Sequence, residues 1–262
     1  MKKVMVAVLL GVILVSTFFI GCLSAIEGSG NLETKQYDLS DFARVDVSHN
    51  FEVEIDQSGS YSVSITSDDN LFEYIQVTRN GETLKIGLKP SIVGPYLGST
   101  TLKAKITMPE LRGLDISGAT RGTVTNFRST EDLDIQVSGA SSLDLVEMSA
   151  SDIDFEISGA SRVTGDIIAN DAVFEVSGGS TVQLEGSVSD IVVDASGASR
   201  VELAAFPVNN ADVTLSGGSS GIVSLEGRLD ADLSGSSKLE YIGERVTLGT
   251  IKTSGGAIVS KK

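Results

Sequence analysis

The 262-residue sequence has no tryptophan, one cysteine, one histidine and four prolines, and aromatic residues make up only 5% of it. Because Cys22 is the only cysteine, the folded part has no internal disulfide and is held by packing and hydrogen bonds. Because His49 is the only histidine, the chain lacks the ligand set of a typical zinc site. The sequence therefore predicts no metal ion and no cofactor.

Positive charge is also scarce. Twenty Lys and Arg stand against 35 Asp and Glu, for a formal net charge of −15. Such a chain repels phosphate backbones, so we expect no nucleic-acid partner. The apolar content of 41% is carried by aliphatic residues and is accompanied by 28 glycines. This composition favours strands joined by tight turns.

The N-terminus has the layout of an export signal. Lys2 and Lys3 precede an apolar run from Val4 to Ile20, and a small residue directly precedes Cys22. This layout resembles a bacterial lipoprotein signal peptide, which predicts cleavage after residues 1–21, lipidation of Cys22, and a flexible tether over residues 22–36. Contact with a membrane would then be through the lipid anchor alone. The alternative is an uncleaved membrane anchor, since about 17 apolar residues are near the lower limit for a span.

Residues 37–262 are expected to form the domain, and its first part, residues 37–110, alternates apolar and polar residues. This period of two predicts strands in "ARVDVS", "FEVEID", "YSVSIT", "IQVT", "TLKIGL" and "TLKAKIT". Asn80-Gly81 between two of these runs predicts a hairpin with a type I′ turn. The segment "PSIVGPYLGS" interrupts the pattern and reads as a loop.

Residues 111–262 contain an internal repeat. Ser-Gly pairs recur eight times at intervals of 18 to 21 residues, beginning at Ser117, Ser138, Ser158, Ser177, Ser196, Ser216, Ser234 and Ser254. Apolar residues stand three positions before each of these serines, at Leu114, Ile135, Phe155, Phe174, Val193, Val213, Ala231 and Ile251. Apolar residues return five positions after most of these serines, at Leu143, Val163, Val182, Val201, Leu239 and Val259. Gly122 and Gly221 break this second apolar column.

The repeat length and its period of two select the fold class. Twenty residues are too few for a propeller blade, and the alternation excludes a helical solenoid. We predict an all-β, single-stranded parallel β-helix of about 20 residues per turn, preceded by the N-terminal strands and their hairpin. In this fold Ser-Gly-Ala/Gly-Ser is a corner, because glycine adopts a backbone conformation that a Cβ opposes and the last hydroxyl can bond to the main chain.

Two charged columns follow from the same alignment. An acidic column stands two residues before the corner serine, at Asp115, Glu156, Glu175, Asp194 and Asp232. This column is either a solvated face, or a face on which Ca²⁺ or another ligand reduces the repulsion between neighbouring carboxylates. A basic column stands four residues after that serine on alternate repeats, at Arg121, Arg162, Arg200 and Lys238. It either offsets the acidic column or contacts acidic glycans.

No catalytic residues are predicted. The stretch Gly217-Gly218-Ser219-Ser220-Gly221 matches the nucleophile-elbow pattern, but that motif needs a strand-to-helix turn and a histidine later in the chain, whereas His49 lies upstream. At the other end, Lys252, Lys261 and Lys262 fall on the final repeat. We interpret them as a defence of the exposed sheet edge against aggregation.

The chain resembles a known family, the auto-transporter adhesins with a head GIN domain. The resemblance rests on "FARVDVSHNFEVEIDQSGSYSVSITSDDNLFEYIQVTRNGETLKIGL", on "MPELRGLDISGAT" and on the recurring "VSGAS" and "VSGGS" units, and it covers about Tyr37 to the C-terminus. It implies an exported, often lipid-anchored domain of β-helix type in the cell envelope. It brings no catalytic residues with it.

Three functions remain open at this point. The first is a lipid-anchored surface adhesin that binds glycan or a surface protein through many repeated contacts. The second is a passive envelope scaffold without a ligand. The third is an enzyme acting on polysaccharide, which rests on fold analogy alone and would need acidic residues clustered in a cleft.

Overall fold

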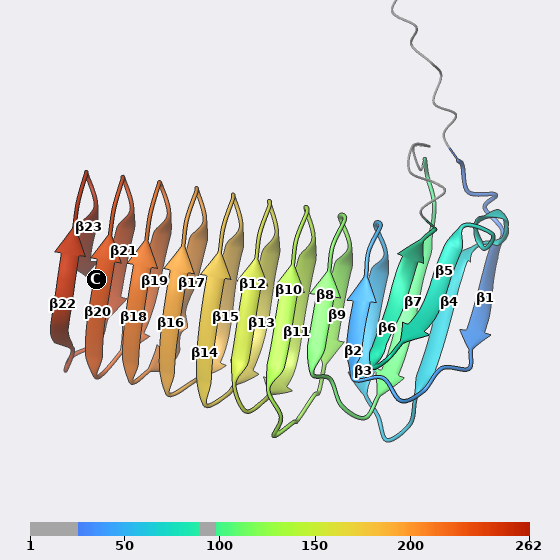
Figure 1. The fold of residues 1–262 in the computed structure, drawn as a ribbon, viewed down its shortest axis with the longest axis horizontal. Helices are drawn as coiled ribbons and strands as arrows, with labels where there is room; N and C mark the ends of the chain where they lie inside the picture. Colours follow the sequence, from blue (N-terminus) through green and yellow to red (C-terminus); the bar gives the residue numbers. More distant parts are fainter. Residues whose placement is uncertain (1–25, 90–97) are drawn as a thin grey trace, which may run out of the picture.

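The computed structural model describes residues 26–89 and 98–262, and almost all of them lie in two long sheets that coil around a common core (Figure 1). Sheet I has twelve strands in the order β1 (Leu32–Tyr37), β4 (Ser62–Asp68), β7 (Leu102–Met108), β3 (Glu52–Gln57), β9 (Arg121–Thr125), β11 (Ser142–Ser149), β13 (Arg162–Ile168), β15 (Thr181–Ser187), β17 (Arg200–Val208), β19 (Ser220–Leu225), β21 (Lys238–Ile242) and β23 (Ile258–Lys261).

Sheet II has eleven strands and lies in front in Figure 1. Their order is β22 (Thr247–Thr253), β20 (Arg228–Leu233), β18 (Asn210–Leu215), β16 (Asp190–Ala195), β14 (Asp171–Val176), β12 (Ile153–Ile157), β10 (Leu133–Val137), β8 (Gly113–Ile116), β2 (Arg44–Val47), β6 (Thr83–Leu88) and β5 (Ile75–Asn80). A short 3₁₀ helix, η1 (Asp69–Leu71), follows β4.

Each repeat makes one turn of the coil, which we call a rung. A rung runs up a strand of sheet II, bends at the Ser-Gly corner and returns along a strand of sheet I. From β8 onward, every strand pairs in parallel with the equivalent strand of the neighbouring rungs. The predicted all-β parallel coil of about 20 residues per turn is therefore confirmed.

The interior is built from vertical stacks of the predicted apolar columns. Ile135, Phe155, Phe174 and Val193 pair in register on successive rungs, and each is at most 2% exposed. The rings of Phe155 and Phe174 stack with their centroids 4.9 Å apart and their planes 4° from parallel. Each rung thus buries its aliphatic face only because the next rung covers it.

The two glycines that interrupt the second column are compensated by larger neighbours. A Cβ on Gly122 would lie 3.1 Å from Leu143 Cδ1, and one on Gly221 would lie 3.2 Å from Leu239 Cδ1. Leu143 and Leu239 are the two leucines in a column that otherwise holds valine on the repeats. Core volume is therefore balanced between neighbouring rungs.

The parallel coil begins earlier than the Ser-Gly repeats. Strand β2 pairs in parallel with β8, and β3 pairs in parallel with β9, so β2 and β3 form a rung of their own. Its corner is Ser48-His49-Asn50, where His49 and Asn50 take positive φ angles of 70° and 62°. Corners without glycine are thus possible at this end, and His49 lies in the turn between β2 and β3.

Antiparallel strands close the N-terminal end of the coil. Strand β4 pairs antiparallel with both β1 and β7, and β5 pairs antiparallel with β6. The flexible tether expected over residues 22–36 is wrong in its last part, because residues 32–37 form β1. Alternation is weak in β1, which is largely exposed, so the period-two pattern predicts no strand there.

The predicted hairpin is present, but its turn differs. Asn80 pairs with Thr83, so the two turn residues are Gly81 and Glu82 rather than Asn80 and Gly81. Gly81 has a φ of +60° and Asn80 remains in the strand, an arrangement with glycine at the first central position that is typical of a type II′ turn. The loop predicted in "PSIVGPYLGS" falls largely outside the described residues.

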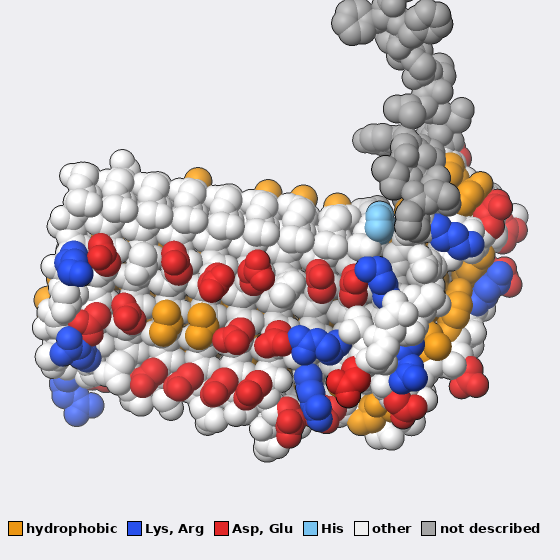
Figure 2. Space-filling view, in the orientation of Figure 1, with side chains coloured by type: hydrophobic (Ala, Val, Ile, Leu, Met, Phe, Trp, Pro, Cys, Tyr) orange, Lys and Arg blue, Asp and Glu red, His pale blue; other side chains and the backbone are white. Residues whose placement is uncertain are grey.

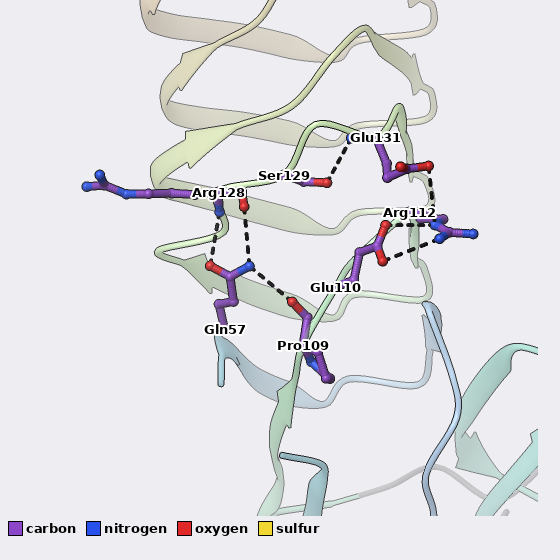
Figure 3. A network of polar contacts seen from close by, with 7 residues as sticks. All are labelled: Gln57, Pro109, Glu110, Arg112, Arg128, Ser129 and Glu131. Carbon is purple, nitrogen blue, oxygen red and sulfur yellow. Dashed lines mark hydrogen bonds and ion pairs between the residues drawn. The ribbon is translucent and has the colours of Figure 1, made fainter. Parts of the chain in front are cut away.

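A polar network joins the N-terminal strands to the repeats on the side opposite the Ser-Gly corners (Figure 3). The side-chain amide of Gln57 donates to Pro109 O at 3.0 Å and accepts the backbone N–H of Arg128 at 3.1 Å. Arg112 forms an ion pair with Glu110 at 2.8 Å. These bonds fix the loops after β7 and β9 against each other where regular sheet pairing is absent.

The Ser-Gly corners are themselves hydrogen-bonded from rung to rung. The backbone N–H of Gly179 donates to Gly159 O at 2.7 Å, and equivalent bonds join the later corners. Gly178 has a φ of +74°, and a Cβ there would lie 2.4 Å from the same carbonyl oxygen of Gly159. Glycine is therefore required twice over, by its backbone angle and by the close approach of the rung below.

The hydroxyl that ends each corner is buried, and on several rungs it binds the main chain as predicted. Ser199, Ser219 and Ser237 donate to the carbonyl oxygen of the serine three residues earlier at 2.8 to 2.9 Å. Thr120, Ser141 and Ser161 make no such bond within the described residues. The small hydroxyl side chain thus serves first to fit the narrow corner.

Prediction: Gly178→Ala should lower the free energy of unfolding by at least about 2 kcal/mol, because the added methyl group meets both a strained φ and a backbone oxygen. Gly179→Ala is the matched control, since a Cβ there lies 3.9 Å from Gly159 O and φ is not positive. Urea denaturation followed by circular dichroism measures both. Equal midpoints for the two variants would contradict the corner model.

Candidate binding faces

The acidic column lies in register on the outer face of sheet II, where Figure 2 shows it as the row of acidic side chains nearest the Ser-Gly corners. Pairing extends the row beyond the five predicted residues to Lys85, Asp46, Asp115, Gln136, Glu156, Glu175, Asp194, Thr214, Asp232 and Lys252. Lys85 pairs with Asp46 at 2.7 Å, and Lys252 pairs with Asp232 at 3.8 Å. Lysines therefore close both ends of the column.

Two further acidic rows run beside this column. The second row contains Asp134, Asp154, Asp212 and Asp230, with Val173 and Val192 between them. Arginines close this row also, since Arg44 reaches across Gly113 to Asp134, and Arg228 binds Asp230. The pKa of Asp230 is strongly depressed by its hydrogen bond to Arg228.

The third row is a hydrogen-bonded ladder. Each side chain accepts the backbone N–H of the equivalent residue one rung further on, at 2.9 to 3.3 Å, along Asp132, Asp152, Asp171, Asp190 and Asn210. The ladder ends at the N–H of Arg228. These side chains have a structural role. The sequence pattern did not reveal it, because their pairing depends on how the chain turns from sheet I back to sheet II.

Crowding of the carboxylates perturbs their ionisation. The pKa of Asp115 is raised, chiefly by burial and then by the neighbouring charge of Asp46. The pKa of Asp154 is raised by burial and by Asp134 and the other aspartates nearby. A shallow depression of about 300 Å³ lies between the two rows, over Asp134, Asp154, Glu156 and Val173. Within residues 26–89 and 98–262, no three His, Cys, Asp or Glu side chains are grouped to hold a metal ion.

The basic column lies on the other side of the molecule from the acidic column. Arg121, Arg162, Arg200 and Lys238 share one row on the outer face of sheet I, separated by Ser142, Thr181 and Ser220. The outer faces of the two sheets point away from the shared core, so the basic column does not neutralise the acidic one through contact. The alternation of large cations with small hydroxyl residues was predictable, but the side of the coil was not.

The four cations have different surroundings. Arg200 pairs with Glu202 at 3.4 Å and Lys238 with Glu240 at 2.5 Å, both partners belonging to the next row of sheet I. Arg121 and Arg162 are exposed and form no ion pair with any described residue. A depression of about 240 Å³ over Ser220 separates Arg200 from Lys238. The column therefore offers two free guanidinium groups and a notch between two further cations.

Ser219, the serine of the elbow-like pattern, is 1% exposed and donates to Ser216 O and Ala195 O, so it is a corner residue rather than a presented nucleophile. His49 contacts Ser48 Oγ through Nδ1 at 2.7 Å. Cys22 lies outside the described residues. The acidic side chains are spread in rows along the open outer face of sheet II.

Comparison with protein families now identifies the architecture. The family model described as "Putative auto-transporter adhesin, head GIN domain" matches residues 41–244. The chain belongs to this family. Its match begins just before β2 and ends after β21, so it spans the parallel coil up to β21 and the antiparallel strands inserted in it. Membership in an adhesin family indicates an exported cell-surface protein.

Solved structures share the fold of this head GIN domain. A "putative adhesin" from Parabacteroides merdae has a TM-score of 0.83 at 18% identity and covers 91% of this chain and 99% of its own. A "putative lipid binding protein" from Parabacteroides distasonis has a TM-score of 0.77 at 21% identity and covers 91% and 100%. Comparison with curated proteins gives no match. No helix in the described ranges has the length and hydropathy to cross a membrane.

Prediction: Asp115→Asn should stabilise the head GIN domain at pH 7, by less than about 1 kcal/mol because the site is only half-buried. Since the folded-state pKa of Asp115 lies above its ordinary value, the carboxylate binds a proton more readily when folded, and its destabilising effect appears as pH rises through that raised pKa. The gain should therefore vanish at pH 3. Thermal unfolding at both pH values tests this, and an equal gain at both would contradict it.

Proposed function

We propose that this head GIN domain protein is a lipid-anchored cell-surface adhesin that binds an acidic glycan along the outer face of sheet I. The observation that carries the proposal is the basic column, in which Arg121, Arg162, Arg200 and Lys238 recur on alternate rungs of a rigid sheet. In a protein of net charge −15, cations held in one row and separated by small hydroxyl residues form a distinct surface.

The spacing of the column suits a polymeric ligand. Rungs lie about 4.8 Å apart, so cations on alternate rungs are roughly 10 Å apart. A glycan with one acidic group per repeat unit of similar length can contact several cations at once. Each exposed ion pair is worth little, about 0–1 kcal/mol, but contacts along one polymer reinforce one another. Avidity without a deep pocket is what such a face can provide.

Sheet II is the less suitable face for this ligand. Its three acidic rows repel polyanions, and its cations, Lys85, Lys252, Arg44 and Arg228, are already paired with carboxylates at the row ends. An acidic glycan would therefore be oriented onto sheet I by repulsion from the opposite side.

Lipid anchoring at Cys22 fits the position of the described fold. The structure starts at Ile26, at the antiparallel end of the coil (Figure 1). Four residues span at most about 14 Å, so a lipid on Cys22 would keep that end close to the membrane. The C-terminal rung would then be the part farthest from the anchor.

A passive scaffold is the second candidate, and the ion pairs of Arg200 and Lys238 favour it. Glu202 and Glu240 neutralise half of the basic column within the sheet itself. A column needed only for charge balance would be expected to make such pairs. The glycan experiment below separates the two functions.

Prediction: residues 22–262 with Cys22→Ser, a form without the apolar run of residues 4–20, should bind uronic-acid glycans on an array more strongly than neutral ones. Arg121→Ser with Arg162→Ser should weaken this binding at least tenfold, since two cations are removed from one row. Arg245→Ser is the control, because it removes one exposed cation that pairs with Glu226 outside the basic column. Absence of binding to any glycan would leave the scaffold as the better description.

Prediction: Cys22→Ser should abolish the incorporation of labelled fatty acid into the protein, because the lipid acceptor is lost. Metabolic labelling together with immunoblotting against the unchanged chain measures this loss. Absence of label from the unchanged chain, with its leader still attached, would support the uncleaved N-terminal anchor instead.

A further inference from the structure

The last rung of the coil leaves both sheets open at the C-terminal end. Strand β22 pairs only with β20, and β23 pairs only with β21, among the described residues. Each of these outer strands therefore has one edge whose backbone groups pair with no other described strand. Such an edge is a ready template for an added strand.

Aliphatic side chains that are buried on earlier rungs are exposed on this one. Leu229 and Leu239 are fully buried, whereas Leu248, the register partner of Leu229, is 50% exposed, and Val259, the partner of Leu239, is partly exposed. On the outer face of sheet I, Ile258 takes the place that Lys238 holds one rung earlier and is 56% exposed. The end of the coil is thus an apolar surface framed by two strand edges.

The charge of this end is opposite to that of the rest of the molecule. Residues 245–262 contain Arg245, Lys252, Lys261 and Lys262 and no Asp or Glu. Lys252 shows 68% of its side chain to solvent. Basic side chains are also visible at this end of the acidic face in Figure 2. A ligand that matches this end carries negative charge.

The N-terminal end is closed by different means. Aromatic side chains of the segments that flank the antiparallel strands pack there, with the rings of Phe42 and Tyr61 4.8 Å apart and Lys35 Nζ 4.0 Å above the ring of Phe72. Phe42 and Leu71 are 1% exposed. Within residues 26–89 and 98–262, it is the C-terminal end that combines open edges with an exposed apolar interior.

We propose that the C-terminal rung binds an extended, acidic segment of another protein, which adds as a strand to the edge of β22 or β23. The backbone of that segment would pair with the open edge, its apolar side chains on one face would cover Leu248 and Ile251 or Ile258, and its carboxylates would meet Lys261 and Lys262. Alternating acidic and aliphatic residues have the required pattern, because successive side chains of a strand point to opposite sides.

A second copy of this chain is a poorer occupant. Two C-terminal ends facing each other would bring their lysines together, and the end is only two strands wide, whereas a stable dimer buries about 800 Å² on each partner. The same lysines would then have two effects. They would prevent two copies of the chain from pairing edge to edge, which is the role expected from the sequence, and they would attract an acidic strand.

The test uses residues 22–262 with Cys22→Ser and two synthetic octapeptides. One peptide alternates Glu and Val and the other alternates Lys and Val, and each is preceded by Pro to limit self-pairing. We expect the Glu-Val peptide to bind at least tenfold more tightly by fluorescence polarisation. We also expect hydrogen exchange to slow at the amides of β22 and β23. Failure of the Glu-Val peptide to bind, or binding of both peptides alike, would overturn the proposal.

Two double variants test the apolar contacts and the charge contacts of the site separately. Leu248→Ser with Ile258→Ser removes the apolar contacts, and Lys261→Glu with Lys262→Glu reverses the charge while keeping them; each should weaken binding at least tenfold. Ile168→Ser is the matched control, since Ile168 is 60% exposed on β13, away from the last rung. Three results would each overturn the proposal. They are an unchanged affinity in both variants, slowed hydrogen exchange confined to β1 and β5, and self-association of the chain through this end in sedimentation.

Discussion

The hydrogen bond from one Ser-Gly corner to the next is the constraint on which the rest of this structure depends. It brings two backbones so close at Gly159 and Gly178 that a single Cβ would collide with the carbonyl oxygen below. The corner therefore fixes the register of both sheets at every rung, since a slip by one residue would turn each aliphatic side chain outward. Because the register is fixed, Phe155 meets Phe174, and each outward position becomes a column along the coil.

Columns concentrate charge, and the chain limits the resulting repulsion in several ways. Gln136 and Thr214 interrupt the acidic column, Lys85 and Lys252 close its ends, and Ser or Thr separates neighbouring cations of the basic column. The pKa of Asp115 is raised by burial first and by the neighbouring charge of Asp46 second. Like charges opposite one another destabilise a sheet, so the composition of the outward columns reflects a compromise between solubility and strain.

The repeat made most of the coil predictable, because period two and a fixed corner spacing are visible in one sequence. The rung of β2 and β3 was missed because its corner, Ser48-His49-Asn50, has no glycine, although "VDVSHNF" matches "LDISGAT" in its apolar and acidic positions. Its partner lies almost 70 residues later, as in Asp46 and Asp115, beyond the inserted antiparallel strands. The side of the coil on which each charged column lies could not be deduced either, since the corner turns the chain from one sheet to the other.

The sides and the end of this molecule suit different kinds of binding. On the sides, each rung presents a similar group, so the loss of one side chain such as Arg162 removes one contact among several and affinity falls gradually. At the end, Leu248 and Ile258 occur once, and their surroundings depend on the absence of a covering rung. A long polymer is therefore matched by the repeated face of sheet I, whereas a single extended segment is matched by the edge strands β22 and β23. The same stacking constraint produces both surfaces, because a coil that buries each rung under the next has uniform sides and one last rung that another strand can cover.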